Sequence, residues 1–421
     1  MRAPILKLNA PKVLIIALLC AAGTEVSPAL AADFQITPSL SVSEEFNDNI
    51  YETATDERSD FVTRIRPGAV LLYRTPSLSG DLGYTFDYRN YARGSRSDEK
   101  AHDLAARGSA AVLDNFFYLD LSDTFRRVSL DVARDVTTET LFRNQTDQNI
   151  AIISPYLLWH PGGKSQLKTG YRYTDTRYWG IAGNVSGIDK QEHRVFAEIS
   201  HDPVERLNLS AGYAFSSVDT DIVSYDQHDI WTGLRYEYAE NSFFFGGIGN
   251  SWQAFSDSRS ASNLFWNAGI RNDFGFLVTT LETKVQYTED PLTASTKETS
   301  HSVKLEKALE HGSIGCTGSY SDFEDTFGAD DRRRTAFSGF GRYEISPRLT
   351  ATLSATGDKV GGASVNDYPY HLSGSAGVSY GFNYDITASL SYGYVDYRRD
   401  WDSAAGARQT NRVVVEVRKV F

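Results

Sequence analysis

The chain is poor in cysteine and methionine, and each shortage excludes a class of protein. Two cysteines occur among 421 residues, and Cys20 lies in the N-terminal leader described below. Cys316 then has no partner for an internal disulfide, so backbone pairing and packing have to hold the fold together. One methionine beside 24 tyrosines is unusual for a helical core and is typical of β-strands.

Long apolar runs and an excess of basic charge are also missing. The apolar run at 13–23 is too short to span a bilayer, and no longer run follows it. The net charge of −12 disfavours nucleic acid as a partner. The mean hydropathy is −0.36. A membrane protein with this profile has to cross as a closed β-barrel, because only helices and closed barrels satisfy their backbone in lipid.

Signals for catalysis and for metal binding are absent or weak. There is no His-Glu-x-x-His motif, no paired-cysteine motif and no histidine pair at metal-ligand spacing. Residues 377–381 match the Gly-x-Ser-x-Gly pattern, but Ser379 lies within an alternating segment rather than a strand–turn–helix. We predict no enzyme, no cofactor and no metal centre. The acidic loop 322–331 is a candidate Ca²⁺ site between lipopolysaccharide phosphates, although a solvated charged loop is the simpler interpretation.

The N-terminus has the three parts of a secretory signal. Arg2, Lys7 and Lys12 provide a basic start, residues 13–23 provide the apolar segment, and residues 29–31 form an Ala-Leu-Ala cleavage site. We predict cleavage after Ala31. Residues 1–31 are then the signal peptide and residues 32–421 form one outer-membrane β-barrel.

Apolar and polar residues alternate along the rest of the chain in segments about as long as a tilted transmembrane strand. Leu207, Leu209, Tyr213 and Phe215 alternate with small or polar residues, so the two sets lie on opposite faces. Short turns, such as those at 114–115, 241–242 and 346–347, alternate with longer polar connections, such as 217–226, 255–262 and 322–333. Periplasmic turns and extracellular loops alternate in this way. The sequence predicts an all-β fold, a single-chain transmembrane antiparallel β-barrel of the outer-membrane type with roughly 18–22 strands.

The last strand of such a barrel closes it against the first. Val413, Val415, Val417 and the terminal Phe421 share one side of the final segment. This arrangement resembles the C-terminal signal that the barrel-insertion machinery recognises. Lys419 departs from it, because those strands usually carry an apolar residue there.

The two faces of the predicted strands differ in chemistry. The apolar face has to contact lipid, and the other face then lines a wet lumen, which is either a channel or a plugged interior. The charged residues that we expect to line the lumen are Arg64, Arg66, Asp87, Arg89, Arg107, Arg172, Arg194, Arg235, Glu237, Arg271, Arg342, Arg412 and Arg418. They either brace the wall through ion pairs or line a path for an anionic or polyhydroxylated solute.

Two further expectations concern the lumen. The first is that Arg64, Arg66, Arg89, Arg412 and Arg418 form a basic arc that favours anions, unless neighbouring carboxylates neutralise it; the carboxylates in question are Asp87, Glu45 and Glu416. The second is that lumen aromatic residues stack on sugar rings or pack against loops; these residues are Tyr118, Phe196, Trp231, Phe245 and Phe265.

The first two strands carry a family resemblance. The segments 38–42 (Pro-Ser-Leu-Ser-Val), 46–50 (Phe-Asn-Asp-Asn-Ile) and 59–68, which ends in Arg-Pro-Gly, resemble a family of outer-membrane β-barrel porins. Its members are often associated with exopolysaccharide and exosortase (PEP-CTERM) gene clusters. The resemblance implies a role in moving a secreted polysaccharide across the outer membrane. We expect no periplasmic helical-repeat domain before the barrel, so a periplasmic polysaccharide-export component would have to deliver the polymer.

The sequence is therefore compatible with two alternative functions. The first is a porin-like channel for polysaccharide export or solute passage. The second is a structural or adhesive barrel whose lumen is closed by loops, which the long connection 127–147 and the balanced lumen charges favour. Either protein would have outer-membrane lipid, lipopolysaccharide and the insertion machinery as partners.

Overall fold

The computed structural model describes residues 32–133, 145–180, 186–326, 331–362 and 368–421. The predicted signal peptide at 1–31 lies outside these ranges. Among the described residues, no helix is long and apolar enough to span a membrane.

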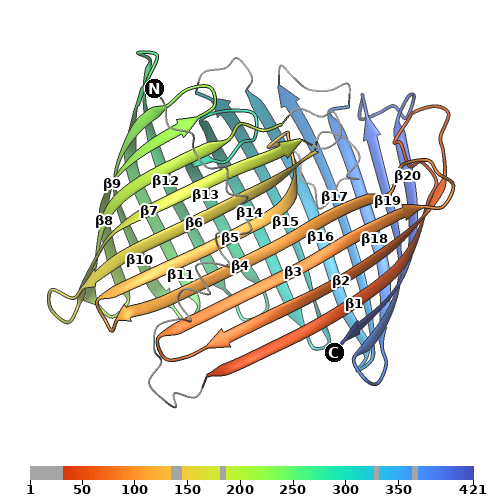
Figure 1. Cartoon of the computed structure of the whole chain (residues 1–421), viewed down its shortest axis with the longest axis horizontal. Helices are drawn as coiled ribbons and strands as arrows, with labels where there is room; N and C mark the ends of the chain where they lie inside the picture. The colour runs from red at the N-terminus through yellow and green to blue at the C-terminus, as the bar shows by residue number, and fades with distance from the viewer. Residues whose placement is uncertain (1–31, 134–144, 181–185, 327–330, 363–367) are drawn as a thin grey trace, which may run out of the picture.

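Twenty antiparallel strands follow one another in chain order around a single sheet (Figure 1). Their bounds are β1 (Asp33–Asn47), β2 (Asp60–Arg74), β3 (Leu78–Tyr91), β4 (Glu99–Leu113), β5 (Phe117–Ser129), β6 (Gln145–Trp159), β7 (Ser165–Gly180), β8 (Lys190–Val204), β9 (Leu207–Thr220), β10 (Tyr225–Ala239), β11 (Ser242–Phe255), β12 (Ser260–Asp273), β13 (Val278–Thr288), β14 (Thr296–Leu309), β15 (Gly312–Asp325), β16 (Arg332–Ser346), β17 (Leu349–Gly362), β18 (Tyr370–Gly381), β19 (Ile386–Arg398) and β20 (Arg408–Val420).

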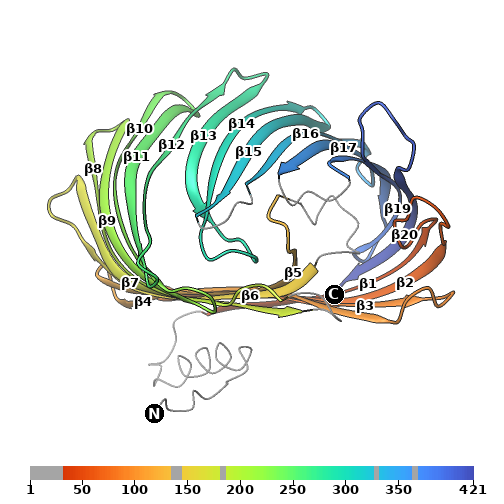
Figure 2. The ribbon, with the colours of Figure 1, turned by 90° about the horizontal axis from the view of Figure 1, so that it is seen from above.

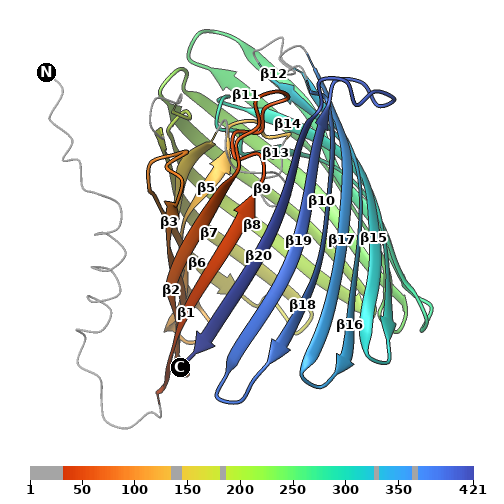
Figure 3. The same ribbon diagram turned by 90° about the vertical axis from the view of Figure 1, so that its right-hand side faces the viewer.

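The sheet closes on itself through its first and last strands. β1 pairs with β20 from Ser39–Val420 to Asn47–Arg412, and the two strands lie side by side in Figure 3. The structure therefore confirms the predicted all-β, closed antiparallel barrel of the outer-membrane type. Its 20 strands lie at the centre of the predicted range.

Apolar side chains cover the outer face of this barrel. Val195, Phe337 and Leu353 are 56%, 63% and 63% exposed, which marks a surface that contacts lipid rather than a protein core. The predicted insertion residues Val413, Val415 and Val417 share this face. Exposed apolar side chains on every second position are the pattern that a bilayer requires.

Short and long connections lie at opposite ends of the barrel. The predicted turns at 114–115, 241–242 and 346–347 join neighbouring strands as expected, and Figure 3 shows such turns at the end that carries the C-terminus. Several loops are shorter than predicted: 217–226 reduces to 221–224, and 255–262 reduces to 256–259. At the extracellular end the strands continue past the apolar band. Apolar residues no longer alternate with polar ones there, so the sequence pattern does not reveal these strand ends.

The buried apolar residues form small clusters at the extracellular end rather than one core. Each of the four clusters contains a loop residue: Ile50, Ala133, Val223 or Tyr368. Loops that fold over or into the barrel therefore account for the apolar packing inside it, and the wall itself contributes little.

The strand ladder is interrupted at two places in the extracellular halves of the strands. Pairing between β4 and β5 stops at Leu104–Phe125, and pairing between β12 and β13 stops at Trp266–Val285. β5 and β13 keep their partners on the other side, β6 and β14. Figure 2 shows the ends of β5 and β13 turning into the barrel. The loops after these two strands therefore enter the lumen.

Val415 and Val414 test which face of β20 contacts lipid. We expect Val415→Arg to reduce the amount of folded protein in outer membranes severely, because Arg on the lipid face costs about 2–4 kcal/mol near the midplane. Val414→Arg is the matched control: Val414 lies opposite Glu45 on the inner face and should tolerate the charge. Heat-modifiable mobility in outer-membrane fractions measures both, and equal loss in the two variants would contradict the assignment of faces.

Candidate functional site

The hydrogen-bond register tells which side chains share the inner face of the barrel. Phe323 and Val360 contact a loop inside the lumen, and residues directly opposite each other across a strand pair lie on the same face. Followed around the sheet, this rule places the predicted lumen residues on the inner face, including Arg64 opposite Arg89 and Arg172 opposite Arg194. Whether they line a path for a solute stays a prediction.

Ion pairs occupy three of the five arginines in the expected basic arc. An Nη of Arg64 lies 2.7 Å from a carboxylate oxygen of Asp87, and an Nη of Arg89 lies 2.8 Å from the same carboxylate. Arg66 pairs with Glu416. These contacts favour the bracing interpretation for this part of the wall.

The pair between Arg66 and Glu416 spans the seam of the barrel. Arg66 lies on β2 and Glu416 on β20, with β1 between them. Ser41 and Ser43 on β1 are small and buried beneath this contact, and the Ser41 hydroxyl accepts a hydrogen bond of 3.2 Å from Arg66. The arginine therefore braces three strands where the two ends of the sheet meet.

The other predicted lumen arginines divide into those that form an ion pair and those that form none within the described chain. Arg194 pairs with Asp229 at 3.2 Å, and Arg342 lies 3.7 Å from Glu344. In contrast, the structure shows no ion pair within the described ranges for the remaining arginines, which are Arg107, Arg172, Arg235, Arg271, Arg412 and Arg418. Three of these, Arg235, Arg271 and Arg418, lie toward the periplasmic end of their strands.

Two segments cross the lumen, and we call residues 130–133 and 289–295 the cross-lumen loops. The first follows β5 and the second follows β13, the two strands that leave the ladder. Both loops reach Arg332 on β16. Arg332 lies 3.2 Å from a carboxylate oxygen of Asp131 and pairs with Asp290 through its other Nη. Its side chain is 7% exposed and that of Asp290 is 0% exposed, so this is a buried contact.

The second cross-lumen loop is fastened to the opposite wall. Lys190 on β8 forms an ion pair of 2.9 Å with Glu289 and donates a hydrogen bond of 3.1 Å to the carbonyl of Asp290. The hydroxyl of Tyr178 on β7 donates to Glu289 at 2.7 Å. On a third side, Gln253 of β11 donates to Ser295 at 3.1 Å. The loop therefore spans the lumen between β8 and β16.

The first cross-lumen loop is held by apolar packing as well as by Arg332. Ala133 packs with Phe323 of β15 and Val360 of β17, with Val132 against the same cluster. Ala133 is completely buried. Residues 134–144, which continue the predicted loop 127–147, lie outside the described residues.

Within the described ranges, no group of three or more His, Cys, Asp or Glu side chains is arranged to hold a metal ion. Ser379 lies within β18 opposite Thr350 and Ser389, which is the strand context that the sequence indicates. In the acidic loop, Glu324 pairs with Lys297 and Asp322 with Arg333, and residues 327–330 lie outside the described ranges.

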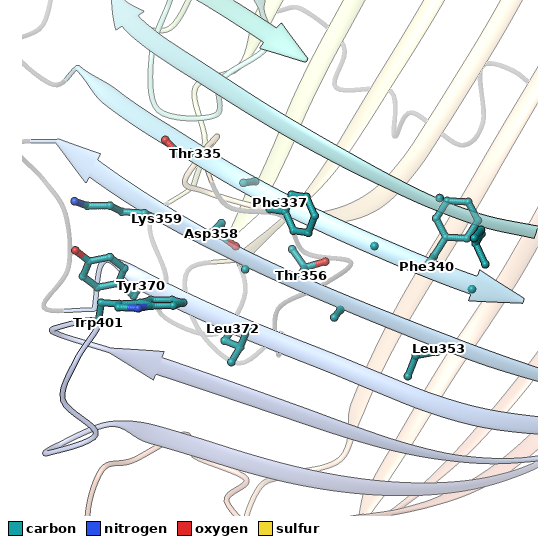
Figure 4. A pocket seen from close by; sticks show the side chains of 17 residues that line it. Thr335, Phe337, Phe340, Leu353, Thr356, Asp358, Lys359, Tyr370, Leu372 and Trp401 are labelled. Atoms are coloured by element: carbon teal, nitrogen blue, oxygen red, sulfur yellow. The ribbon is translucent and has the colours of Figure 1, made fainter. Parts of the chain in front are cut away.

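A groove of about 820 Å³ lies on the outer face, over β15–β18 (Figure 4). Phe337 and Leu372 flank Gly357, which lies opposite both. Lys359 and Trp401 lie at one end of the groove. Its apolar walls belong to the lipid-facing set, so the groove contacts membrane lipid and is separate from the lumen.

Comparisons with known proteins show the fold and no closer relationship. No family model and no curated protein matches the chain. Among solved structures, the FrpB iron transporter of Neisseria meningitidis has a TM-score of 0.55 at 9% identity, over 91% of this chain and 81% of that one. The ferric enterobactin receptor PfeA of Pseudomonas aeruginosa has 0.54 at 9% identity, over 92% and 80%. The ferric-catecholate receptor Fiu of E. coli has 0.53 at 9% identity, over 92% and 82%.

This likeness and the apolar outer face agree on location. The chain has the architecture of a Gram-negative outer-membrane barrel and crosses that membrane as a multi-pass protein. The solved neighbours are transporters and receptors for iron compounds. At 9–10% identity they indicate the fold only.

The residues that sequence reasoning missed are those that tie the cross-lumen loops. Arg332 falls in the predicted loop 322–333, although it is the first residue of β16. Arg332 is an even number of residues from Arg334 and Arg342. Extending the predicted strand to Arg332 would therefore have placed its side chain on the inner face. Asp131, Lys190 and Asp290 carry no periodic signal, because they lie in loops or at a strand end.

The seam pair generates a prediction about selectivity. The charge-neutral double change Arg66→Gln/Glu416→Gln should lower the free energy of unfolding by about 1–3 kcal/mol and leave the anion-to-cation permeability ratio unchanged. Arg418→Gln is the control, because this exposed arginine has no ion pair within the described chain. It should leave stability within about 1 kcal/mol and shift the ratio toward cations. Urea unfolding in vesicles and reversal potentials measure the two effects; a shift in the seam variant alone would show that the paired charges set selectivity.

Proposed function

We propose that this barrel is an outer-membrane channel for a polar solute, and that it takes part in the export of an extracellular polysaccharide. The observation that carries the proposal is the inner wall. Small, hydroxyl and charged side chains line it on nearly every strand, and in the described part of the chain the buried apolar clusters occur only where loops enter. Such a wall is hydrated, and a hydrated lumen through a membrane-spanning barrel conducts unless loops close it.

The cross-lumen loops set the aperture in this proposal. They leave the wall at two places and meet at Arg332, so the free cross-section at that level is the lumen minus these segments. An uncharged or anionic chain threading the barrel has to pass beside the loops. The family resemblance of strands β1 and β2 supports polysaccharide as the cargo. A periplasmic export component would deliver the polymer, while lipopolysaccharide and the insertion machinery would be partners in the membrane.

A second function is favoured by the same loops. If residues 130–133 and 289–295 fill the passage, the barrel is a structural or adhesive protein with a closed lumen. The pairs of Arg332 with Asp131 and with the fully buried Asp290 support this alternative, because they hold both loops in one place. The ion-paired arginines at the seam also support this alternative, because arginines that brace the wall have a structural role that does not require conduction.

Single-channel recording in planar bilayers distinguishes the two functions. We expect steady open current from the wild type and a larger conductance from Arg332→Ala, because that change frees both cross-lumen loops from the wall. Arg333→Ala is the matched control: Arg333 is the next residue, is 62% exposed and pairs with Asp322 at 3.4 Å. A silent wild type together with a silent Arg332→Ala barrel that is folded by heat modifiability would overturn the channel proposal.

Removal of Arg332 also has a cost in stability. Asp290 would remain buried without its partner, and an uncompensated buried charge costs about 3–5 kcal/mol. Arg332→Ala/Asp290→Asn should recover part of this loss, because the unpaired charge is then absent. Urea midpoints of the single and double variants in vesicles test the pairing, and equal midpoints would show that the contact does not bear on stability.

A further inference from the structure

Aromatic rings on the inner wall of β5–β12 are seated on glycines of the neighbouring strand. A Cβ added to Gly212 would stand 2.2 Å from the indole of Trp231. One added to Gly249 would stand 2.3 Å from the ring of Phe265. Real Cβ atoms do not approach this closely, so each ring lies in space that only glycine leaves open.

The same arrangement repeats on both sides of this pair. The ring of Phe196 covers Gly170, at 2.8 Å from the Cβ position, and the ring of Phe245 covers Gly269, at 2.6 Å. We call Tyr118, Tyr156, Phe196, Trp231, Phe245 and Phe265 the aromatic track. For Phe196, Trp231, Phe245 and Phe265, the covered glycine lies directly opposite the aromatic residue across a strand pair.

Three of the four covered glycines lie on alternate strands. Gly170, Gly212 and Gly249 belong to β7, β9 and β11, whereas Gly269 belongs to β12. Strands are spaced about 4.8 Å apart, so the sites at Gly170, Gly212 and Gly249 are separated by roughly 10 Å along the wall. This spacing is comparable to the length of a disaccharide unit in an extended glycan.

The track climbs along the wall toward the cross-lumen loops. Tyr118 is the second residue of β5, next to a periplasmic turn, whereas Phe265 lies near the middle of β12. Four residues beyond Gly249 on β11, Gln253 binds Ser295 of the second cross-lumen loop. The rings therefore form a path from the periplasmic mouth toward the level of the second cross-lumen loop.

Cationic groups lie on the rings. The ammonium of Lys168 is 3.9 Å from the ring centroid of Tyr156 and 5.9 Å from that of Phe196. The guanidinium of Arg172 is 5.8 Å from the Phe196 ring. Tyr118 and Tyr156 stack at 5.3 Å. Cations next to aromatic faces provide hydrogen-bond donors at the edge of an apolar platform.

Packing alone does not account for the whole track. The six side chains are half-buried, and none of them belongs to the apolar clusters that the loops form in the described chain. Covering a glycine buries one side of a ring and leaves the other toward the lumen. A water-filled passage with a row of half-exposed rings is a surface that an apolar partner would stabilise.

We propose that the aromatic track binds a glycan chain as it moves through the barrel. The C–H face of a pyranose is apolar and weakly positive, and it stacks on the negative face of an aromatic ring. The hydroxyl groups at the sugar edge then reach charged side chains of the same wall, such as Lys168, Arg172 and Glu198. The inference rests on the proposed channel function and adds the surface that recognises the cargo.

Block of channel current by linear oligosaccharides tests the track. Maltohexaose, cellohexaose and an acidic hexaguluronate are added to one side of a planar bilayer, and their dissociation constants are taken from the current block. We expect at least one of them to block the wild type, and Trp231→Ala or Phe196→Ala to weaken that block about tenfold, since one stacked ring contributes roughly this factor. Trp252→Ala is the matched control, because Trp252 lies on the outer face and is 47% exposed.

The outcomes separate the inference from the function on which it rests. If an oligosaccharide blocks all three variants as tightly as the wild type, or if the wild type conducts and no oligosaccharide blocks it, the track is overturned. The channel proposal is unaffected by either result. If the barrel does not conduct, calorimetric titration of the detergent-solubilised protein measures oligosaccharide binding instead. Binding that is lost with Trp231→Ala and kept with Trp252→Ala supports the track. No binding to the wild type overturns it. A Gly212→Val variant, which moves the Trp231 ring without removing it, should weaken binding as Trp231→Ala does.

Discussion

The need to pair every backbone polar group inside the bilayer dictates the rest of this structure. No water is available there, so an open sheet edge would leave a row of unpaired amides and carbonyls in lipid. The pairing of β1 with β20 removes that edge. Where the ladder opens, between β4 and β5 and between β12 and β13, it does so in the extracellular halves of the strands. At that level water can satisfy the freed groups, and the strands can turn inward.

Turning inward has consequences for the lumen. The loops after β5 and β13 bring carboxylates into the barrel, and a buried carboxylate needs a partner. Arg332 provides one for Asp131 and for Asp290, and Lys190 provides one for Glu289. The charges of the wall at Arg332 and Lys190 therefore hold these loops in place, while several other arginines of the lumen form no ion pair within the described residues.

The sequence predicted the barrel well because its main signal is local. A period of two, short turns such as 114–115 and a terminal strand with Val413, Val415 and Val417 on one side are each readable without knowledge of distant contacts. The strand ends were less predictable. Beyond the apolar band both faces are polar, so the alternation weakens and loops such as 217–226 were drawn too long.

The candidate site was predictable only in part, for the same reason. Parity along a strand gives Arg64 and Arg66 an inner face, but it does not show that Asp87 and Glu416 neutralise them. Asp131, Asp290 and Arg332 are far apart in the chain, and only the inward turn of two strands brings them together. The seating of Trp231 on Gly212 depends on the register between β9 and β10, which no single-strand pattern contains.

The proposed channel depends most on the cross-lumen loops staying fixed to the wall residues that hold them while the barrel conducts. A disulfide tether tests this directly: Ala133→Cys and Val360→Cys in a Cys316→Ser background, since Ala133 and Val360 belong to one buried cluster. The account predicts that the disulfide forms readily in the folded barrel and that conductance before and after its reduction equals that of the wild type. A tether that does not form, or a conductance that changes several-fold when it closes, would contradict the account.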